Sequence, residues 1–254
     1  MKELIKVRNL WKRYGALQVL KGLDLDVYDQ ETVVILGRSG VGKSVLLKQL
    51  IGIEKPDQGS VEVDGVVLTN LSTTERYKAS LNMGMLFQGA ALFDSMTVGE
   101  NVAFYLRQHD KKLTEKEIWE RVDAALSDVG LQGVQDKMPS DLSGGMRKRA
   151  ALARVTIYHP RIILYDEPTT GLDPVTSMQI NDLINQAKEK LKATAIVVTH
   201  DIKSAMMVGD RLAFHDEGKI VQIAPKHEFV HLDDARVQAF FDKAVITEDM
   251  IQNG

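Results

Sequence analysis

Three short apolar runs dominate the hydrophobic pattern of the chain: TVVIL at 32–36, RIILY at 161–165 and TAIVV at 194–198. Runs without polar interruption are typical of strands buried on both faces of a parallel sheet. All are far shorter than the ~20 residues of a membrane-spanning helix. The segments 3–36 and 59–71 also contain alternating apolar and polar residues, which indicates half-buried strands. Two hairpins are predicted, with turns at Asp64–Gly65 and near Glu217–Gly218.

Helical spacing of apolar residues appears in three other places. It follows the glycine-rich segment 37–44, covers the middle of the chain from about 89 to 159, and returns at 233–245. In the middle region, Thr114 and Glu117 have the spacing of a capping box. The residues assigned to the face of the first helix are Val45, Leu46, Gln49, Leu50 and Ile53, which are apolar except for Gln49. Those of the middle region are Ile118, Val122, Ala125 and Val129, and those of the last stretch are Val237, Phe240, Phe241 and Ala244. The helical middle is interpreted as an insertion into one α/β core.

Composition narrows the class of protein. The 254 residues are enough for one domain with a subdomain, and the mixed net charge of −3 does not indicate a nucleic-acid-binding protein. Without cysteine, the chain has no disulfide and no cysteine-based zinc site. The first fifteen residues mix charged and apolar side chains, unlike a secretory signal. We therefore expect a soluble chain whose role at a membrane, if any, depends on a partner.

The segment GRSGVGKS at 37–44 matches the phosphate-binding pattern G-x-x-x-x-G-K-[ST] between a predicted strand and a predicted helix. Its backbone N–H groups are expected to surround the β-phosphate of a nucleotide, Lys43 to reach the β- and γ-oxygens, and Ser44 to ligate Mg²⁺. The alternative is a glycine-rich turn that binds nothing. The predicted ATP-binding residues here are Gly37, Arg38, Ser39, Gly40, Val41, Gly42, Lys43, Ser44 and Val45.

The run RIILY delivers Asp166 to the carboxyl end of a predicted parallel strand, where open α/β sheets bind ligands. Asp166 is predicted to hold Mg²⁺ through water. Glu167 follows directly and should point elsewhere, so it is a candidate general base that polarises the attacking water. The alternative for Glu167 is a surface carboxylate at a helix start.

The segment DLSGGMRKRAALARV at 141–155 places a serine and two glycines directly before a helical pattern. A helix start offers free N–H groups, and Ser143, Gly144 and Gly145 leave them accessible, so this is a second candidate anion site. It contains no lysine of the kind found in the first site. Such a site suits a phosphate that is already bound from the other side.

Several ordered motifs resemble those of the ATP-binding cassette (ABC) ATPases. LSGGM at 142–146 resembles the family's signature motif, although Met146 stands where glutamine is commonest. The resemblance covers roughly 2–225. It implies that Tyr14 stacks on adenine, that Gln88 senses Mg²⁺ and the attacking water, that Asp173 belongs to the D-loop, and that His200 contacts the γ-phosphate. The implied fold is α/β, a P-loop NTPase of the ABC type with a RecA-like core, an antiparallel β subdomain and an inserted α-helical subdomain.

The resemblance also implies partners. Two copies of the chain would pack head to tail, so that Ser143, Gly144 and Gly145 of each copy close on the ATP bound by the other. A single cassette without long heptad repeats fits a transporter ATPase better than a DNA-repair or a translation-type ABC protein. We therefore predict an ABC ATPase domain at 1–225, with the helical insertion at about 89–159, and a helical extension at 226–254.

Within the transporters, LSGGMRKRAALAR and YDEPTTGLDPVTS resemble the ATPases of Mce-linked lipid transporters, the maintenance-of-lipid-asymmetry (Mla) group. That resemblance implies phospholipid cargo, an integral-membrane permease, a periplasmic Mce-domain protein, a small STAS-domain protein, and a location on the cytoplasmic face of the inner membrane. The alternative is the ATPase of an amino-acid or osmolyte importer. The apolar residues Ala91, Leu92, Phe93, Met96 and Val98 either form a groove for a permease helix or pack the subdomain's own core.

Overall fold

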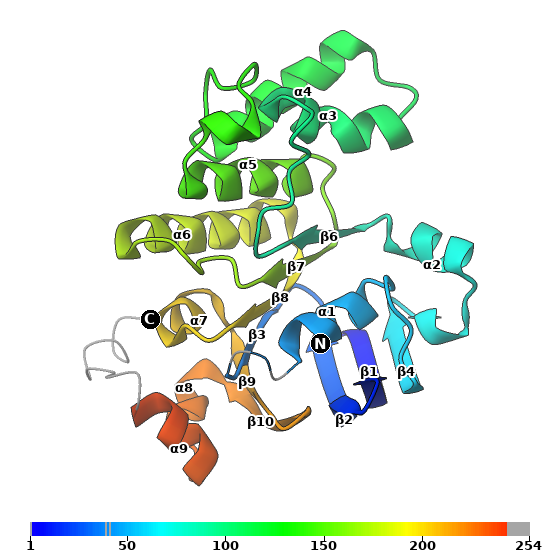
Figure 1. Cartoon of the computed structure of the whole chain (residues 1–254), viewed down its shortest axis with the longest axis vertical. Helices are drawn as coiled ribbons and strands as arrows, with labels where there is room; N and C mark the ends of the chain where they lie inside the picture. Colours follow the sequence, from blue (N-terminus) through cyan, green and yellow to red (C-terminus); the bar gives the residue numbers. More distant parts are fainter. Residues whose placement is uncertain (1, 39, 41, 243–254) are drawn as a thin grey trace.

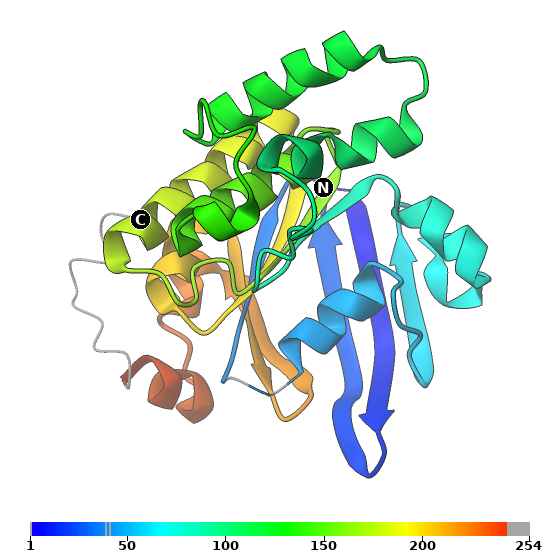
Figure 2. The same ribbon diagram turned by 45° about the horizontal axis from the view of Figure 1, so that its top comes forward.

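A parallel sheet forms the centre of the molecule. The computed structural model describes residues 2–38, 40 and 42–242 and contains two sheets (Figures 1 and 2). The larger one has six strands in the order β10-β9-β3-β8-β7-β6. Its strands are β3 (Thr32–Leu36), β6 (Met83–Leu86), β7 (Ile162–Asp166), β8 (Thr194–Thr199), β9 (Arg211–Asp216) and β10 (Lys219–Pro225). All pairings are parallel except that of the edge strand β10 with β9.

The three uninterrupted apolar runs are therefore β3, β7 and β8, and their neighbours explain the pattern. Val33 and Ile35 of β3 belong to a hydrophobic cluster with helix α1 (Lys43–Leu50) and the second sheet. Val34 and Leu36 belong to a second cluster on the opposite face, which includes residues of the helical middle of the chain and of the helices that follow it. A strand covered on both faces has no position where a polar side chain would reach water.

The second sheet is antiparallel, with the order β2-β1-β4-β5. It consists of β1 (Glu3–Tyr14), β2 (Leu17–Tyr28), β4 (Gln58–Val63) and β5 (Val66–Val67). The hairpin between β4 and β5 turns at Asp64 and Gly65, both left-handed with φ of 48° and 81°, as predicted. A similar turn joins β9 to β10 at Glu217 and Gly218.

An α-helical subdomain stands above the parallel sheet (Figure 1). It contains α3 (Val98–His109), α4 (Glu115–Asp128), the short η2 (Pro139–Asp141) and α5 (Gly144–Thr156). The predicted capping box is present, because Thr114 accepts a hydrogen bond from the Glu117 N–H and the Glu117 carboxylate accepts one from Thr114. Caps of this kind contribute about 1 kcal/mol each. The four predicted apolar residues of this region are buried in one cluster.

The remaining elements complete the cover of the core. They are η1 (Leu68–Asn70), α2 (Thr73–Ser80), α6 (Pro174–Leu191), α7 (Ile202–Val208), α8 (Lys226–Phe229) and α9 (Ala235–Asp242). Among the described residues, no helix combines the length and the hydropathy needed to cross a membrane. The expectation for Ile53 was wrong: α1 ends at Leu50, and Ile53 lies beyond it with 57% of its surface exposed.

The last helix, α9, packs on its own chain. Val237 is buried, and the rings of Phe240 and Phe214 lie 5.2 Å apart between centroids. Ala244, the fourth residue of the predicted face, is outside the described residues. The described part of the extension therefore covers β9, whereas the domain bounds 1–225 and 226–254 stay predictions.

Candidate active site

Most of the predicted nucleotide-binding residues meet at the carboxyl edge of the parallel sheet. Strands β3, β8, β7 and β6 are neighbours in that order and run in the same direction. The segments that follow them carry the P-loop, His200, the carboxylate pair and Gln88, so these groups must converge. They form a pocket of about 340 Å³. Its described lining consists of Tyr14, Val19, Gly40, Gly42, Lys43, Ser44, Val45, Gln88, Glu167, Thr170 and His200.

The P-loop is bent so that the amine of Lys43 folds back on it. The Lys43 Nζ donates to the carbonyls of Gly37 at 2.7 Å and Arg38 at 2.9 Å. A Cβ atom on Gly42, whose φ is 107°, would lie 2.6 Å from Val19 Cγ1, and one on Gly37 would lie 2.4 Å from the His215 carbonyl. Glycine is thus required at both positions. Ser39 and Val41 are outside the described residues.

Lys43 is a buried cation, with 5% of its surface exposed. Burial lowers its pKa, and the nearby Glu167 carboxylate offsets part of that effect. The Lys43 Nζ lies 3.4 Å from Glu167 Oε1. The lysine is therefore positioned inside the pocket before any phosphate enters it.

Two oxygen ligands meet beneath the loop. The Ser44 hydroxyl donates to Asp166 Oδ1 at 2.7 Å, and burial raises the pKa of Asp166. A hydroxyl and a desolvated carboxylate are hard oxygen donors, and an ion between them would relieve the cost of burying the charge. The pair therefore fits Mg²⁺. Gln88, the third predicted ligand, is exposed and lines the same pocket.

Glu167 has different partners from Asp166. Its Oε2 accepts a hydrogen bond from the Thr170 hydroxyl at 3.0 Å and lies 2.9 Å from His200 Nδ1. Its backbone is left-handed, with φ of 46°, a conformation that costs a residue other than glycine about 1–2 kcal/mol. This turn aims the carboxylate at Lys43, His200 and Thr170 rather than at Ser44. Sequence reasoning missed Thr170, although it lies in the quoted segment TTGLD.

Tyr14 stands at the mouth of the pocket with 43% of its surface exposed. Its hydroxyl donates to Glu54, and the Lys12 Nζ lies 5.6 Å from the centre of its ring. Burial, together with the Glu54 carboxylate, raises the pKa of Tyr14 to about 12, so it is a neutral phenol at physiological pH. An exposed ring held by its hydroxyl is a suitable surface for stacking a nucleotide base.

The second predicted anion site is separate from this pocket. Ser143 is the N-cap of α5, and its hydroxyl accepts a hydrogen bond from the Met146 N–H at 3.2 Å. Asp173 is the N-cap of α6 and accepts a hydrogen bond from the Thr176 N–H at 3.0 Å. A Cβ atom on Gly145 would lie 2.6 Å from Thr176 Cγ2, so the two helix starts are adjacent. The structure thus places Ser143 next to Asp173, and neither residue is among the described residues that line the P-loop pocket.

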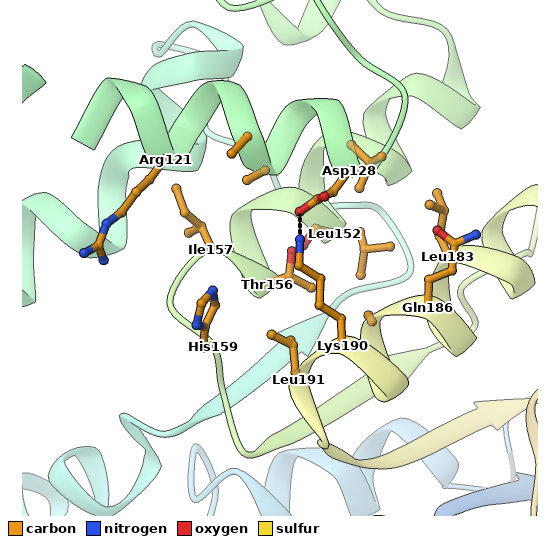
Figure 3. Close-up of a pocket in the computed structure, with 14 residues that line it drawn as sticks. Arg121, Asp128, Leu152, Thr156, Ile157, His159, Leu183, Gln186, Lys190 and Leu191 are labelled. Carbon is orange, nitrogen blue, oxygen red and sulfur yellow. Dashed lines mark hydrogen bonds and ion pairs between the residues drawn. The ribbon is translucent and has the colours of Figure 1, made fainter. Parts of the chain in front are cut away.

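A second cavity, of about 380 Å³, lies between α4, α5 and α6 (Figure 3). Its floor is apolar and includes Leu152 and Leu183, and Lys190 of α6 reaches across it to Asp128 of α4 at 2.5 Å. It shares no residue with the described lining of the P-loop pocket. This cavity therefore marks the junction between the helical subdomain and the core.

Comparison with known proteins shows which family the chain resembles. The family model described as ABC transporter matches residues 20–170. The chain is 39% identical to the intermembrane phospholipid transport system ATP-binding protein MlaF of Haemophilus influenzae, over 93% of this chain and 89% of that protein. It is 41% identical to the chloroplastic protein TRIGALACTOSYLDIACYLGLYCEROL 3 of Arabidopsis thaliana, over 93% of this chain and 73% of that protein.

Other matches show the breadth of the family. The probable ribonucleotide transport ATP-binding protein mkl of Mycobacterium leprae is 40% identical, over 94% of this chain and 68% of that protein. A sulfate/thiosulfate import ATP-binding protein of Rhodopseudomonas palustris is 37% identical, over 98% of this chain and 71% of that protein. Among solved structures, a dimeric ATP-binding cassette in a post-hydrolysis state with ADP and Pi matches with a TM-score of 0.81 and 31% identity, covering 87% of this chain and 98% of that one.

Proposed function

The chain belongs to the ABC transporter family and is an ATPase of that family, and we propose on this premise that it powers phospholipid transport between two membranes. The observation that carries the ATPase site is the arrangement of Lys43, Glu167 and His200 around one pocket. The observation that supports the cargo is the similarity to MlaF over nearly the whole of both chains.

In the proposed reaction, the residues of the pocket have distinct roles. In the structure, the Lys43 Nζ contacts the Glu167 carboxylate and the loop carbonyls. When ATP binds, Lys43 leaves these partners and binds the β- and γ-phosphates instead. Ser44, Asp166 and Gln88 hold Mg²⁺, which supplies neutralisation of the phosphate charge. Glu167 accepts the proton of the attacking water, and His200 orients that carboxylate and contacts the γ-phosphate. Tyr14 stacks on the adenine.

The second anion site is proposed to act on a second copy of the chain. Ser143, Gly144, Gly145 and Asp173 lie outside the P-loop pocket of their own chain, and Ser143 and Asp173 are exposed. A head-to-tail dimer would bring them to the γ-phosphate in the partner's pocket. ATP would then join the two copies, and its hydrolysis would release them.

The contact with the permease is proposed to lie after Gln88. Phe93 is 43% exposed and packs on Phe104, with 4.9 Å between ring centroids, whereas Val98 is fully buried in the chain's own core. Arg154 of α5 donates to the carbonyls of Ala90 and Ala91, at 3.0 and 2.7 Å. Those two residues are left-handed, with φ of 65° and 52°. The loop that presents Phe93 is thus held by the signature helix, which would carry motion to the permease.

The Phe93 proposal has a direct test. In the complex with the permease, Phe93→Asp should abolish ATP-driven transport while ATP binding by the chain stays at the wild-type level. Ile53→Asp, a change at another exposed apolar residue in a different part of the chain, is the matched control. Loss of ATP binding in Phe93→Asp would contradict a docking role.

The remaining partners are proposed from the Mla resemblance. They are an integral-membrane permease, a periplasmic Mce-domain protein and a small STAS-domain protein, with the ATPase peripheral on the cytoplasmic face of the inner membrane. A small-solute importer is the second candidate, because import ATPases match over the same length.

Purification of the tagged chain from detergent-solubilised host membranes, with mass spectrometry of proteins and lipids, separates the two candidates. Co-purification of a permease and an Mce-domain protein with bound phospholipid supports the lipid transporter. A permease that arrives with a solute-binding protein and without phospholipid would establish the importer instead.

A further inference from the structure

Lys148 is a buried lysine that none of the proposed roles uses. It is the fifth residue of α5, in the second turn of the helix, and 5% of its surface is exposed. A buried ammonium group must find a strong acceptor, because its desolvation is otherwise costly. The acceptor is the backbone carbonyl of Glu167, at 3.1 Å from the Lys148 Nζ.

The backbone of Glu167 is held from both sides. Its N–H donates to the Val198 carbonyl of β8 at 2.9 Å, and its carbonyl accepts from the Lys148 Nζ at 3.1 Å and from the Thr170 N–H at 3.3 Å. Between these bonds the residue adopts the left-handed conformation that directs its carboxylate to Lys43 and His200. Strained backbone of this kind persists only where the surroundings fix it. Lys148 is one of the three groups that do so, and the only one of them that belongs to α5.

The charge of Lys148 also faces the active-site carboxylates. Asp166 and Glu167 are the anions whose interaction favours its protonated form, against the effect of burial, which lowers its pKa. The two carboxylates are thus flanked by Lys43 on the phosphate side and by Lys148 on the α5 side.

We propose that Lys148 is a positioning residue for ATP hydrolysis, which fixes Glu167 and ties it to the helix that begins at the signature serine, Ser143. When Ser143 contacts the partner's nucleotide, α5 would then change the position of Glu167, the general base of the same chain, because one rigid helix connects the two residues. The inference rests on the proposed role of Glu167 as general base. It adds a residue that the motif pattern did not single out.

The test measures steady-state ATP hydrolysis and ATP binding in the intact chain. Lys148→Met removes the donor and the charge but keeps the length of the side chain. It should lower kcat by about 10- to 100-fold, the size of effect that a misplaced catalytic group produces, with KM and ATP affinity within about twofold of wild type. Lys148→Arg, which keeps a charged donor, should recover part of the loss.

Arg149→Met is the matched control. Arg149 is the next residue on α5, and it donates to the carbonyls of Val129 and Gly130 instead of Glu167. It should retain kcat within about twofold of wild type, as expected for a residue away from the reacting groups. Wild-type kcat in Lys148→Met, or an equal loss in Arg149→Met, would overturn the inference. If Lys148→Met does not fold, Lys148→Gln replaces it with the same expected and contradicting results.

A double mutant separates this inference from the role of Glu167. If Lys148 acts through Glu167, adding Lys148→Met to Glu167→Gln should cause no further loss in single-turnover rate. A further loss as large as that of Lys148→Met alone would show that the lysine acts independently. Wild-type turnover in Glu167→Gln itself would instead contradict the assignment of the general base.

Discussion

The two segments proposed to bind phosphate, the P-loop and the signature segment, differ in how many of their polar groups are buried and partnered. At the P-loop, Lys43 and Glu167 are buried, and their polar atoms have partners within 3.4 Å: two carbonyls, His200 and Thr170. At the signature segment, Ser143 is exposed and its hydroxyl accepts one hydrogen bond, from the Met146 N–H at its own helix start. One segment belongs to a built pocket, and the other presents a helix terminus to the surface.

This difference in burial indicates different roles for the two segments in binding ATP. A buried cation with several acceptors can bind the triphosphate within one chain, because the desolvation cost is already met in the folded protein. An exposed helix start binds an anion weakly unless another surface removes the surrounding water. We therefore expect the signature segment to bind phosphate only together with a second molecule, and this contrast can be tested from the larger to the smaller expected effect.

Glu167→Gln should have the largest effect, since it removes the general base but keeps the shape of the side chain. We expect the rate of ATP hydrolysis to fall by roughly 10²–10⁴-fold while ATP still binds. Hydrolysis by the purified chain and binding of a fluorescent ATP analogue measure the two quantities. The loss of the negative partner of Lys43 should not weaken nucleotide binding, and a variant that fails to bind ATP would contradict this reading.

Ser143→Ala should leave ATP binding by the isolated chain unchanged but lower hydrolysis by about 10²–10³-fold, because a donor to the developing charge is lost. It also removes the α5 cap, at a cost of about 1 kcal/mol in stability.

Mixing Ser143→Ala with Glu167→Gln sharpens the comparison. In a head-to-tail dimer of the two variants, one site combines an intact P-loop chain with an intact signature segment, so part of the activity should return. If both segments served one nucleotide within one chain, every site would carry a defect and mixing would restore nothing.

His215 should make the region beneath the P-loop sensitive to acid. It is fully buried in β9, and neither ring nitrogen has a partner among the residues that the structure describes. Burial, with a contribution from Lys43, lowers its pKa from 6.5 to about 4. Between these two values the unfolded chain binds the proton and the folded chain does not, so stability falls as the pH falls, by roughly 2–4 kcal/mol in total.

Thermal unfolding between pH 4 and 7.5 measures this dependence. His215→Met should remove that part of the slope, whereas His231→Gln, a change at an exposed histidine, should leave it in place. Equal slopes in wild type and His215→Met would show that the buried imidazole does not control acid stability.

The smallest effect is expected at the junction shown in Figure 3, where Asp128 and Lys190 join α4 to α6. Both side chains are about half exposed, at 51% and 59%, so the ion pair should contribute less than about 1 kcal/mol. Asp128→Ala should therefore shift the unfolding midpoint only slightly, and less so at high salt. A large loss of stability in Asp128→Ala would mean that this ion pair, rather than the apolar floor of the cavity, holds the α-helical subdomain to the core.

Local patterns predicted most of the fold. The runs that became β3, β7 and β8 were recognisable because a strand covered on both faces excludes polar residues. The glycine turns were recognisable because few residues other than glycine tolerate left-handed backbone, and the Thr114 cap because few side chains can accept a hydrogen bond from the N–H groups at a helix start. Ile53 was misplaced, because periodicity continues past a helix that ends early, and element boundaries are weakly encoded.

The motif residues of the site were also visible in the sequence, but their partners were not. Glycine spacing and strand ends pointed to Lys43, Ser44, Asp166 and Glu167. Thr170 and Lys148 were given no role, although both lie within the quoted segments YDEPTTGLDPVTS and LSGGMRKRAALAR. Thr170 is three positions from Glu167 in the sequence, whereas Lys148 is nineteen positions away. The Lys148 contact therefore requires that a separate element, α5, packs beside the end of β7.

The sequence by itself determined the elements and the phosphate-binding loop, because backbone sterics and side-chain periodicity act over a few residues. The class of reaction followed from the resemblance of its motifs to those of the ABC ATPases. The tertiary structure alone decided which strands are neighbours, and so which groups surround Glu167: Lys43, His200 and Lys148 come from segments up to 124 positions away from it, as their numbering shows. It also decided that the described part of the tail packs on β9. Such choices depend on the burial of whole faces, which no local stretch of sequence encodes.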